Sequence, residues 1–299
     1  RNAPKVWKAF ISVLLEVKNM MKLLKANLAR LWKNKVFWMA FLVLNVFCII
    51  QKIAIIQDTV EVHYLEEAFW IQAYVIGIIL SVFISLFVGA EYEYGTIRNK
   101  IISGYDRSDI YLANIFTCII AGWIMCMGCL ISSLLVGVPF LGFFHAELSE
   151  ILIQGICVFA LSAAYTAIYC FFVMVIPNRT VVAVVCILLS FAQLFFGIVV
   201  GNRLDETEYY YIPDASLGIG EIDDGSNSKW IRNPDYLEGT ERRIYEIAFE
   251  VIPGGQSLQL SGMYFIEHTS YMEMFSASAA WIILSCGCGL ILFRRKDLR

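Results

Sequence analysis

Residues 181–200 read VVAVVCILLSFAQLFFGIVV, a run without a charged side chain. A bilayer core about 30 Å thick needs roughly 20 apolar residues of helix, because every backbone polar group must be satisfied within the segment. This run therefore predicts a membrane-spanning helix at 180–201. The whole chain is similar: 59% of its 299 residues are hydrophobic, 16% are charged, and the mean hydropathy is +0.67. Because soluble domains carry roughly 25% charged residues, this composition excludes a soluble globular protein.

Five more segments have the length and polarity of membrane spans. They lie near residues 36–56, 68–90, 112–138, 151–176 and 274–293. Gln51 and Lys52 interrupt the first of them, and we expect Lys52 to extend its amine toward the lipid head groups. The sequence therefore predicts an all-α membrane protein with six transmembrane helices.

Lysine and arginine divide unevenly between the two sides of this topology. The side that holds both termini carries 17 basic and 6 acidic residues, whereas the other side carries 6 basic and 20 acidic residues. Because cytoplasmic loops are enriched in Lys and Arg, both termini are predicted to be cytoplasmic in a plasma membrane. The net charge of −3 does not indicate nucleic-acid binding.

Residues 1–20 are expected to be a leader or a non-native extension. Position 1 is Arg1, and the first methionine is Met20. If Glu16 and Val17 were encoded GAG-GTG, those bases would form a ribosome-binding site just before that methionine. We therefore expect untranslated leader, or else the remnant of a longer chain. The first interpretation indicates a bacterial gene, and N-terminal sequencing of the native protein tests it.

Residues that carry chemistry are sparse. All nine cysteines lie in expected spans, which argues against a disulfide framework or a zinc site. The histidines, His63, His145 and His268, lie in separate outer loops, outside any HExxH pattern. The sequence contains neither a GxSxG elbow nor a GxxxxGK[ST] phosphate loop. We therefore expect no catalytic residue, no metal site and no cofactor bound by this chain, so we do not expect it to be an enzyme by itself.

Five amides lie inside the expected spans, without a central acid or base. They are Asn45, Gln72, Asn114, Gln154 and Gln193. Hydrogen bonds between helices are the expected role, and a substrate path is the alternative.

The segment 21–35 is predicted to form an amphipathic helix before the first span. Leu24, Leu28, Leu31 and Trp32 share one half of its helical wheel. Lys22, Lys25, Arg30 and Lys33 occupy the other half. Such a helix would lie in the cytoplasmic membrane interface, with its cations toward anionic head groups. A plain positively charged flank is the alternative.

The segment 91–111, EYEYGTIRNKIISGYDRSDIY, joins the second and third spans. We expect Thr96 to cap a short helix that runs through Ile102, and Gly104 to end it. Ser108 or Asp109 is expected to cap the third span. A short helix held just inside the cytoplasm offers a surface to a partner, and a solvated loop is the alternative.

This segment strongly resembles the cytoplasmic loop of type-2 ABC exporter permeases. The matching residues are Glu91, Gly95, Thr96, Arg98, Asn99, Lys100, Gly104 and Arg107. A basic amphipathic elbow, six spans and a long loop before the last span are also similar to that family, from about residue 21 to the end. Residues 1–19 depart from the pattern.

The resemblance implies a homodimeric or heterodimeric permease whose loop docks on a separate ABC ATP-binding subunit, which holds ATP and Mg²⁺. Arg98, Lys100 and Arg107 could pair with acidic residues of that subunit, and Ile97, Ile101 and Ile102 could give the helix an apolar face.

The loop 202–273 carries 14 acidic and 5 basic residues and is rich in tyrosine. We expect a small folded extracellular cap. In the family, part of this loop dips back into the outer leaflet, and Val251 to Met263 is the candidate. An acidic, aromatic surface could attract cationic peptides, although simple solvation is the more common role of acidic loops.

These observations favour the permease subunit of an ATP-driven exporter of antimicrobial peptides, lipids or drugs. The alternative is a non-transporting membrane sensor or scaffold that binds a ligand through 202–273. An intramembrane enzyme lacks a recognisable constellation of catalytic residues.

Overall fold

The computed structural model describes residues 5–57, 64–66, 69–212, 229–264 and 270–296. Six of its helices are long and apolar enough to cross a membrane, so by helix length and hydropathy the chain is a multi-pass membrane protein. They are α2 (Lys35–Gln57), α3 (Gln72–Glu93), α5 (Arg107–Leu141), α6 (Leu148–Val175), α7 (Arg179–Leu204) and α10 (Tyr271–Arg295). The all-α fold with six spans is thus confirmed, and each predicted span lies within a few residues of its helix.

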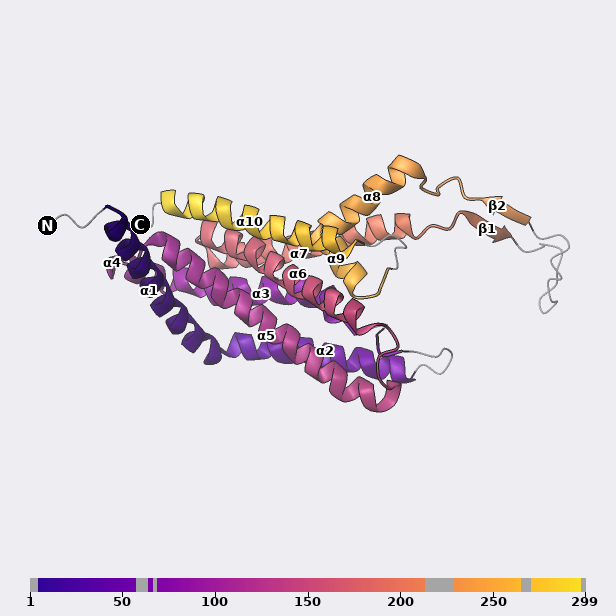
Figure 1. The fold of residues 1–299 in the computed structure, drawn as a ribbon, viewed down its shortest axis with the longest axis horizontal. Coiled ribbons are helices and arrows are strands. Elements are labelled where there is room, and N and C mark those ends of the chain that lie inside the picture. Colours follow the sequence, from indigo (N-terminus) through magenta and orange to yellow (C-terminus); the bar gives the residue numbers. More distant parts are fainter. Residues whose placement is uncertain (1–4, 58–63, 67–68, 213–228, 265–269, 297–299) are drawn as a thin grey trace.

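The six helices run along the long axis of the molecule and alternate in direction (Figure 1). One end holds α1 (Lys5–Trp32), α4 (Thr96–Ile102) and the last turn of α10. The opposite end holds β1 (Tyr209–Ile212), β2 (Lys229–Arg232) and α8 (Gly239–Val251). We call these the basic end and the acidic end, after the charges counted above. This placement agrees with the predicted alternation of the loops.

The core of the bundle lies around α6, which contacts α3, α5, α7 and α10. Small residues allow the close approach: a Cβ atom on Gly77 of α3 would lie 2.8 Å from the Tyr165 ring of α6. Tyr165 stacks on Tyr169 one turn further along. All nine cysteines are free thiols within α2, α5, α6, α7 and α10, as their placement in the spans predicted.

Helix α1 is longer than the predicted elbow, because it begins at Lys5 and packs against α5. Leu31 is buried and Leu24 and Leu28 are half-buried, whereas Trp32 is exposed and contacts Trp38. The chain turns at Asn34, whose Oδ1 accepts hydrogen bonds from the backbone N–H groups of residues 36 and 37 and so caps α2.

Two predictions about individual cations are wrong. Lys52 does not reach for head groups, because its side chain is fully buried and its Nζ donates to the Leu65 carbonyl at 3.0 Å. Arg30 does not stay on the outer face of α1, because it turns inward and pairs with Glu91. In both cases the cation bonds a polar group of the protein, and the Arg30 side chain stays 32% exposed whereas Lys52 is fully buried.

The acidic end combines a two-stranded ribbon with two short helices. Strands β1 and β2 pair antiparallel, with Tyr210 opposite Ile231. Helix α9 (Pro253–Leu260) packs against α3, α6, α7 and α8, and its residues are almost all buried. This segment therefore folds back onto the bundle, and its predicted entry into the outer leaflet of a membrane stays a prediction. Residues 213–228 and 265–269 of the cap, with His63 and His268, lie outside the described residues.

Candidate functional site

Helix α4, in the middle of the segment 91–111, is defined by glycine at both ends. Gly95 precedes it with φ of 65°, and Gly104 follows it with φ of 85°, a region that L side chains rarely adopt. The N–H of Gly104 bonds the Ile101 carbonyl at 2.9 Å, and the N–H of residue 105 bonds the Lys100 carbonyl at 3.2 Å. This pair of bonds is a Schellman motif, so the predicted ending at Gly104 is confirmed.

Both predicted capping residues in this segment are wrong. Gly95 is the N-cap of α4, and Thr96 is its first helical residue. Helix α5 begins at Arg107, directly after the extended residue Asp106, so Ser108 and Asp109 already lie in its first turn. Neither N-cap residue, Gly95 or Asp106, makes a side-chain capping hydrogen bond.

Glu91 lies at the end of α3 and is completely buried. Its Oε1 is 2.8 Å from Lys100 Nζ of α4 and 2.5 Å from Arg30 Nη1 of α1. Its Oε2 accepts a hydrogen bond from Asn114 Nδ2 of α5 at 3.0 Å. One carboxylate therefore joins four helices, and we call these residues, together with Asn27, the Glu91 cluster.

Further contacts connect the members of the Glu91 cluster, although Arg30 Nε and Nη2 have no hydrogen-bond partner among the described residues. Asn27 Nδ2 of α1 donates to Asn114 Oδ1 at 2.7 Å, and the Arg30 guanidinium lies 4.1 Å from the centre of the Phe87 ring. Burial lowers the pKa of Lys100, and the adjacent Glu91 carboxylate acts in the opposite direction. The expected interhelical role of Asn114 is confirmed.

The other amides differ in their partners. Gln154 Nε2 of α6 donates to the Tyr271 hydroxyl of α10 at 2.9 Å, which is the expected interhelical bond. Asn45 bonds the Phe41 carbonyl of its own helix instead. Within the described residues, neither polar atom of the buried Gln72 side chain has a partner, and Gln193 Oε1 also has none.

Arg107 holds the C-terminal end of α10. Its Nη1 donates to the Arg294 carbonyl at 3.0 Å and to the Lys296 carbonyl. Lys296 Nζ in turn donates to the Tyr92 hydroxyl and the Met174 carbonyl, both at 3.1 Å, and burial lowers the pKa of this amine to about 8. Cations that bond the last carbonyls of a helix stabilise its end.

Of the three predicted docking cations, Lys100 and Arg107 therefore bond within the chain, whereas Arg98 is exposed. The isoleucines of the expected apolar face also differ in burial: Ile97 is 2% exposed, whereas Ile102 is 74% exposed. Tyr94 and Asn99 are exposed beside them. We call Tyr94, Arg98, Asn99 and Ile102 the α4 surface.

A polar cleft of about 640 Å³ adjoins the α4 surface. It is lined by Ile101, Gly104, Tyr105, Asp106, Arg107, Ser108, Asp109 and Arg294. Arg294 Nε donates to Ser108 Oγ at 2.7 Å across this region, so α5 and α10 form its wall. Of the eight residues that carry the family resemblance, Glu91, Lys100 and Arg107 fix the segment to the bundle. The two glycines flank α4, Thr96 begins it, and Arg98 and Asn99 are exposed.

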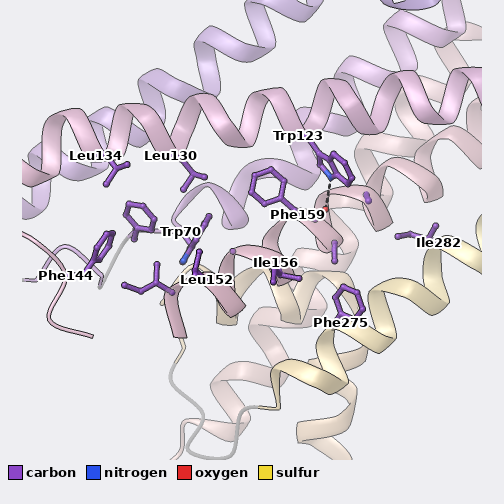
Figure 2. A pocket seen from close by; sticks show the side chains of 15 residues that line it. Trp70, Trp123, Leu130, Leu134, Phe144, Leu152, Ile156, Phe159, Phe275 and Ile282 are labelled. Carbon is purple, nitrogen blue, oxygen red and sulfur yellow. Dashed lines mark hydrogen bonds between the residues drawn. The ribbon is translucent and has the colours of Figure 1, made fainter. Parts of the chain in front are cut away.

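A second cavity of about 640 Å³ opens on the side of the bundle between α5, α6 and α10 (Figure 2). Aromatic side chains dominate it, including Trp70, Trp123 and Phe159, and Trp123 Nε1 donates to the Phe159 carbonyl at 3.1 Å. None of the described residues that line it is charged. This cavity was not predictable from the sequence, because the residues that line it come from segments far apart in the chain. The apolar lining of this cavity suits a hydrocarbon group.

Glu250 is a buried acid at the acidic end. It lies in the last turn of α8 and is 1% exposed, and its Oε1 accepts a bond from the Ser270 N–H at 3.1 Å. The charged groups around it are Arg243 and Glu246 of α8 and Glu273 of α10, with Arg243 Nη2 3.0 Å from Glu273 Oε1. Burial raises the pKa of Glu250 to about 7, although the Ser270 N–H acts in the opposite direction.

This raised pKa predicts a pH-dependent stability. A carboxyl whose pKa is higher in the folded than in the unfolded state destabilises the fold as pH rises from about 4.5 through about 7. The melting temperature of the detergent-solubilised protein should therefore fall across this interval, and Glu250→Gln should reduce the fall. Glu241→Gln, on the exposed side of α8, is the control and should leave the profile unchanged. An identical profile for Glu250→Gln would contradict the assignment.

Comparison with known proteins adds no family. No protein-family model matches the chain, and no curated protein matches it. The resemblance of residues 91–114 to exporter permeases therefore stays a prediction.

Proposed function

We propose that the chain is the membrane-spanning permease subunit of an ATP-driven exporter in a bacterial plasma membrane. In this proposal the basic end, with both termini, faces the cytoplasm, and the α4 surface binds a separate ATP-binding subunit. ATP and Mg²⁺ bind that partner and not this chain. A second permease chain, identical or different, completes the transporter.

The observation that carries the proposal is the two-sided character of α4. Its outer side exposes Arg98 and Ile102, and this combination of positive charge and apolar area suits a protein partner. Its inner side is joined through Lys100 and Glu91 to α1, α3 and α5. A displacement imposed on α4 by a partner would therefore move several helices together. This is the requirement for coupling nucleotide hydrolysis to a conformational change in the membrane.

The contacts of Arg107 extend the same connection. Because α5 begins at Arg107, and Arg107 bonds the end of α10, the segment that follows α4 is coupled to the last span. Lys296 links that end of α10 to the Tyr92 hydroxyl of α3. Motion of α4 would thus reach α3, α5 and α10 through direct polar contacts.

Substitutions on the α4 surface test this function. Arg98→Glu and Ile102→Asp should each reduce the amount of ATP-binding subunit that copurifies with the tagged chain from native membranes by roughly tenfold or more, because interface anchors of this type contribute at least ~1.4 kcal/mol. Vanadate-sensitive ATP hydrolysis in the purified material should fall in parallel.

Lys33→Glu, which changes an exposed cation directly after α1 at the same end, is the matched control and should retain the partner. Since both α4 positions are exposed, the melting temperature should stay at the wild-type value. Normal copurification and hydrolysis in both α4 variants would count against the proposed role.

A sensor or scaffold is the second candidate, and the ribbon of β1 and β2 favours it. This element extends beyond the bundle at the acidic end, where a ligand could reach it (Figure 1). A sensor would copurify with a kinase or regulator in place of an ATP-hydrolysing subunit, so the same purification separates the two functions.

A further inference from the structure

The ribbon of β1 and β2 carries an exposed apolar surface. Tyr209 and Tyr210 of β1 are 47% and 43% exposed, and Trp230 and Ile231 of β2 are 65% and 49% exposed. The pairing places Tyr210 directly opposite Ile231, so these two side chains share one face of the ribbon. A two-stranded ribbon is marginal in water without a cover, and an exposed apolar cluster of this kind marks an interaction site.

The surroundings of the ribbon have an excess of negative charge. The arginines nearby are already paired: Arg203 with Asp235 at 3.5 Å, and Arg232 with Glu208 at 3.7 Å and with Glu238. Across 202–273 the sequence has 14 acidic against 5 basic residues. The loop therefore keeps a net negative charge even when each of its basic residues is paired.

Three carboxylates next to the ribbon have no ion-pair partner among the described residues. They are Asp205, Glu206 and Glu241. Glu206 accepts hydrogen bonds from the Tyr210 hydroxyl at 2.7 Å and from Asn233 Nδ2 at 3.0 Å. The hydrogen bond from Tyr210 lowers the pKa of Glu206, so this carboxylate is charged at neutral pH. It lies beside the exposed Tyr210 side chain of β1.

We propose that one face of the ribbon, defined by Asp205, Glu206, Tyr210 and Ile231, binds a cationic amphipathic peptide. The lysine or arginine side chains of the peptide pair with Asp205 and Glu206, and the apolar side chains of the peptide cover Tyr210 and Ile231. An extended peptide can also add to a strand edge of the ribbon through main-chain hydrogen bonds. The proposal goes beyond the transport function, because it requires neither an ATP-binding subunit nor nucleotide.

The charge selects this occupant over the other candidates. An anionic bilayer surface would be repelled by the acidic excess, although aromatic side chains alone would suit it. A second copy of the ribbon would bring like charges together and would leave the carboxylates uncompensated. A cationic amphipathic peptide would both cover the exposed apolar side chains and neutralise the carboxylates.

The test uses the purified full chain in neutral detergent and a fluorescently labelled peptide of alternating lysine and leucine, followed by fluorescence anisotropy. We expect saturable binding that weakens at least tenfold between low and high salt, because the attraction is between exposed charges. A peptide with glutamate in place of each lysine should not bind. The double variant Asp205→Asn/Glu206→Gln should weaken binding at least tenfold and flatten the salt dependence.

Ile231→Ser should weaken binding severalfold, whereas Ile244→Ser, an equally polar change at an exposed position of α8, should not. Because all of these positions are exposed or peripheral, the melting temperature reports whether each variant keeps its fold. Equal binding of the acidic peptide, or unchanged affinity in every ribbon variant, would overturn the proposal. So would ribbon-dependent self-association without peptide binding, measured by light scattering, since it would identify a second copy as the occupant. Without an ATP-binding subunit in the assay, failure here leaves the transport proposal untouched.

Discussion

Replacing Glu91 with alanine should destabilise the protein by roughly 3–5 kcal/mol, the cost of removing one partner from a buried ion pair. The variant leaves the Arg30 and Lys100 cations close together at the C-terminal end of α3 without their carboxylate. It also leaves Asn114 Nδ2 without its acceptor. Thermal or denaturant unfolding in detergent, followed by circular dichroism, measures the effect.

Glu93→Ala is the control for this substitution. Glu93 lies in the same turn of α3, but its side chain is 50% exposed and its partner Arg179 is 31% exposed. Since exposed ion pairs contribute about 0–1 kcal/mol, the control should be nearly neutral. Adding Lys100→Met to Glu91→Ala removes one unpaired cation and should recover part of the loss. Equal effects of Glu91→Ala and Glu93→Ala would show that the Glu91 cluster does not stabilise the basic end.

Replacing Gly254 with alanine should be comparably severe, because the contact is with backbone. A Cβ atom at this position would overlap the Gln193 carbonyl of α7, and no side-chain rotation can relieve that overlap. Inserting a group into such packing costs about 1–3 kcal/mol and sometimes more, and here α9 has to move away from α7. We therefore expect a lower melting temperature and loss of the ordered acidic end, detected by increased proteolysis near α9.

Gly287→Ala is the matched control, since nothing lies within 4 Å of the added Cβ in α10. Alanine favours a helix over glycine by about 0.5–1 kcal/mol, so this variant should be neutral or slightly more stable. A Gly254→Ala protein as stable as Gly287→Ala would contradict the tight packing of α9 on α7.

The long helices were predictable from sequence because a membrane span depends on a local property. A run such as 181–200 has to satisfy its own backbone, so its composition identifies it without knowledge of neighbours. The ends of the helices were predicted less accurately: α5 begins at Arg107, before both of its predicted capping residues. A prediction of helix caps from sequence considers side-chain types and not the backbone geometry, so it can misplace the start of a helix.

The candidate site was predictable as a segment but not as a set of contacts. Thr96 and Gly104 indicated a short helix between them, and the structure has it, although Gly95 rather than Thr96 is the N-cap. The inward turn of Arg30 was not predictable, because Arg30 and Glu91 are far apart in sequence and a helical wheel places the arginine with the other outward-facing cations. The same limit applies to Lys52, whose partner, the Leu65 carbonyl, lies in the following loop.

The role of α4 as a docking element is tested most directly by photocrosslinking. A photoreactive amino acid in place of Ile102, which is 74% exposed, is irradiated in native membranes, and captured proteins are identified by mass spectrometry. We predict capture of a protein that contains a GxxxxGK[ST] phosphate loop, whereas the same label in place of Leu135, 72% exposed on the side of α5, captures none. Absence of such a protein at position 102, or equal capture at both positions, would contradict the proposed function.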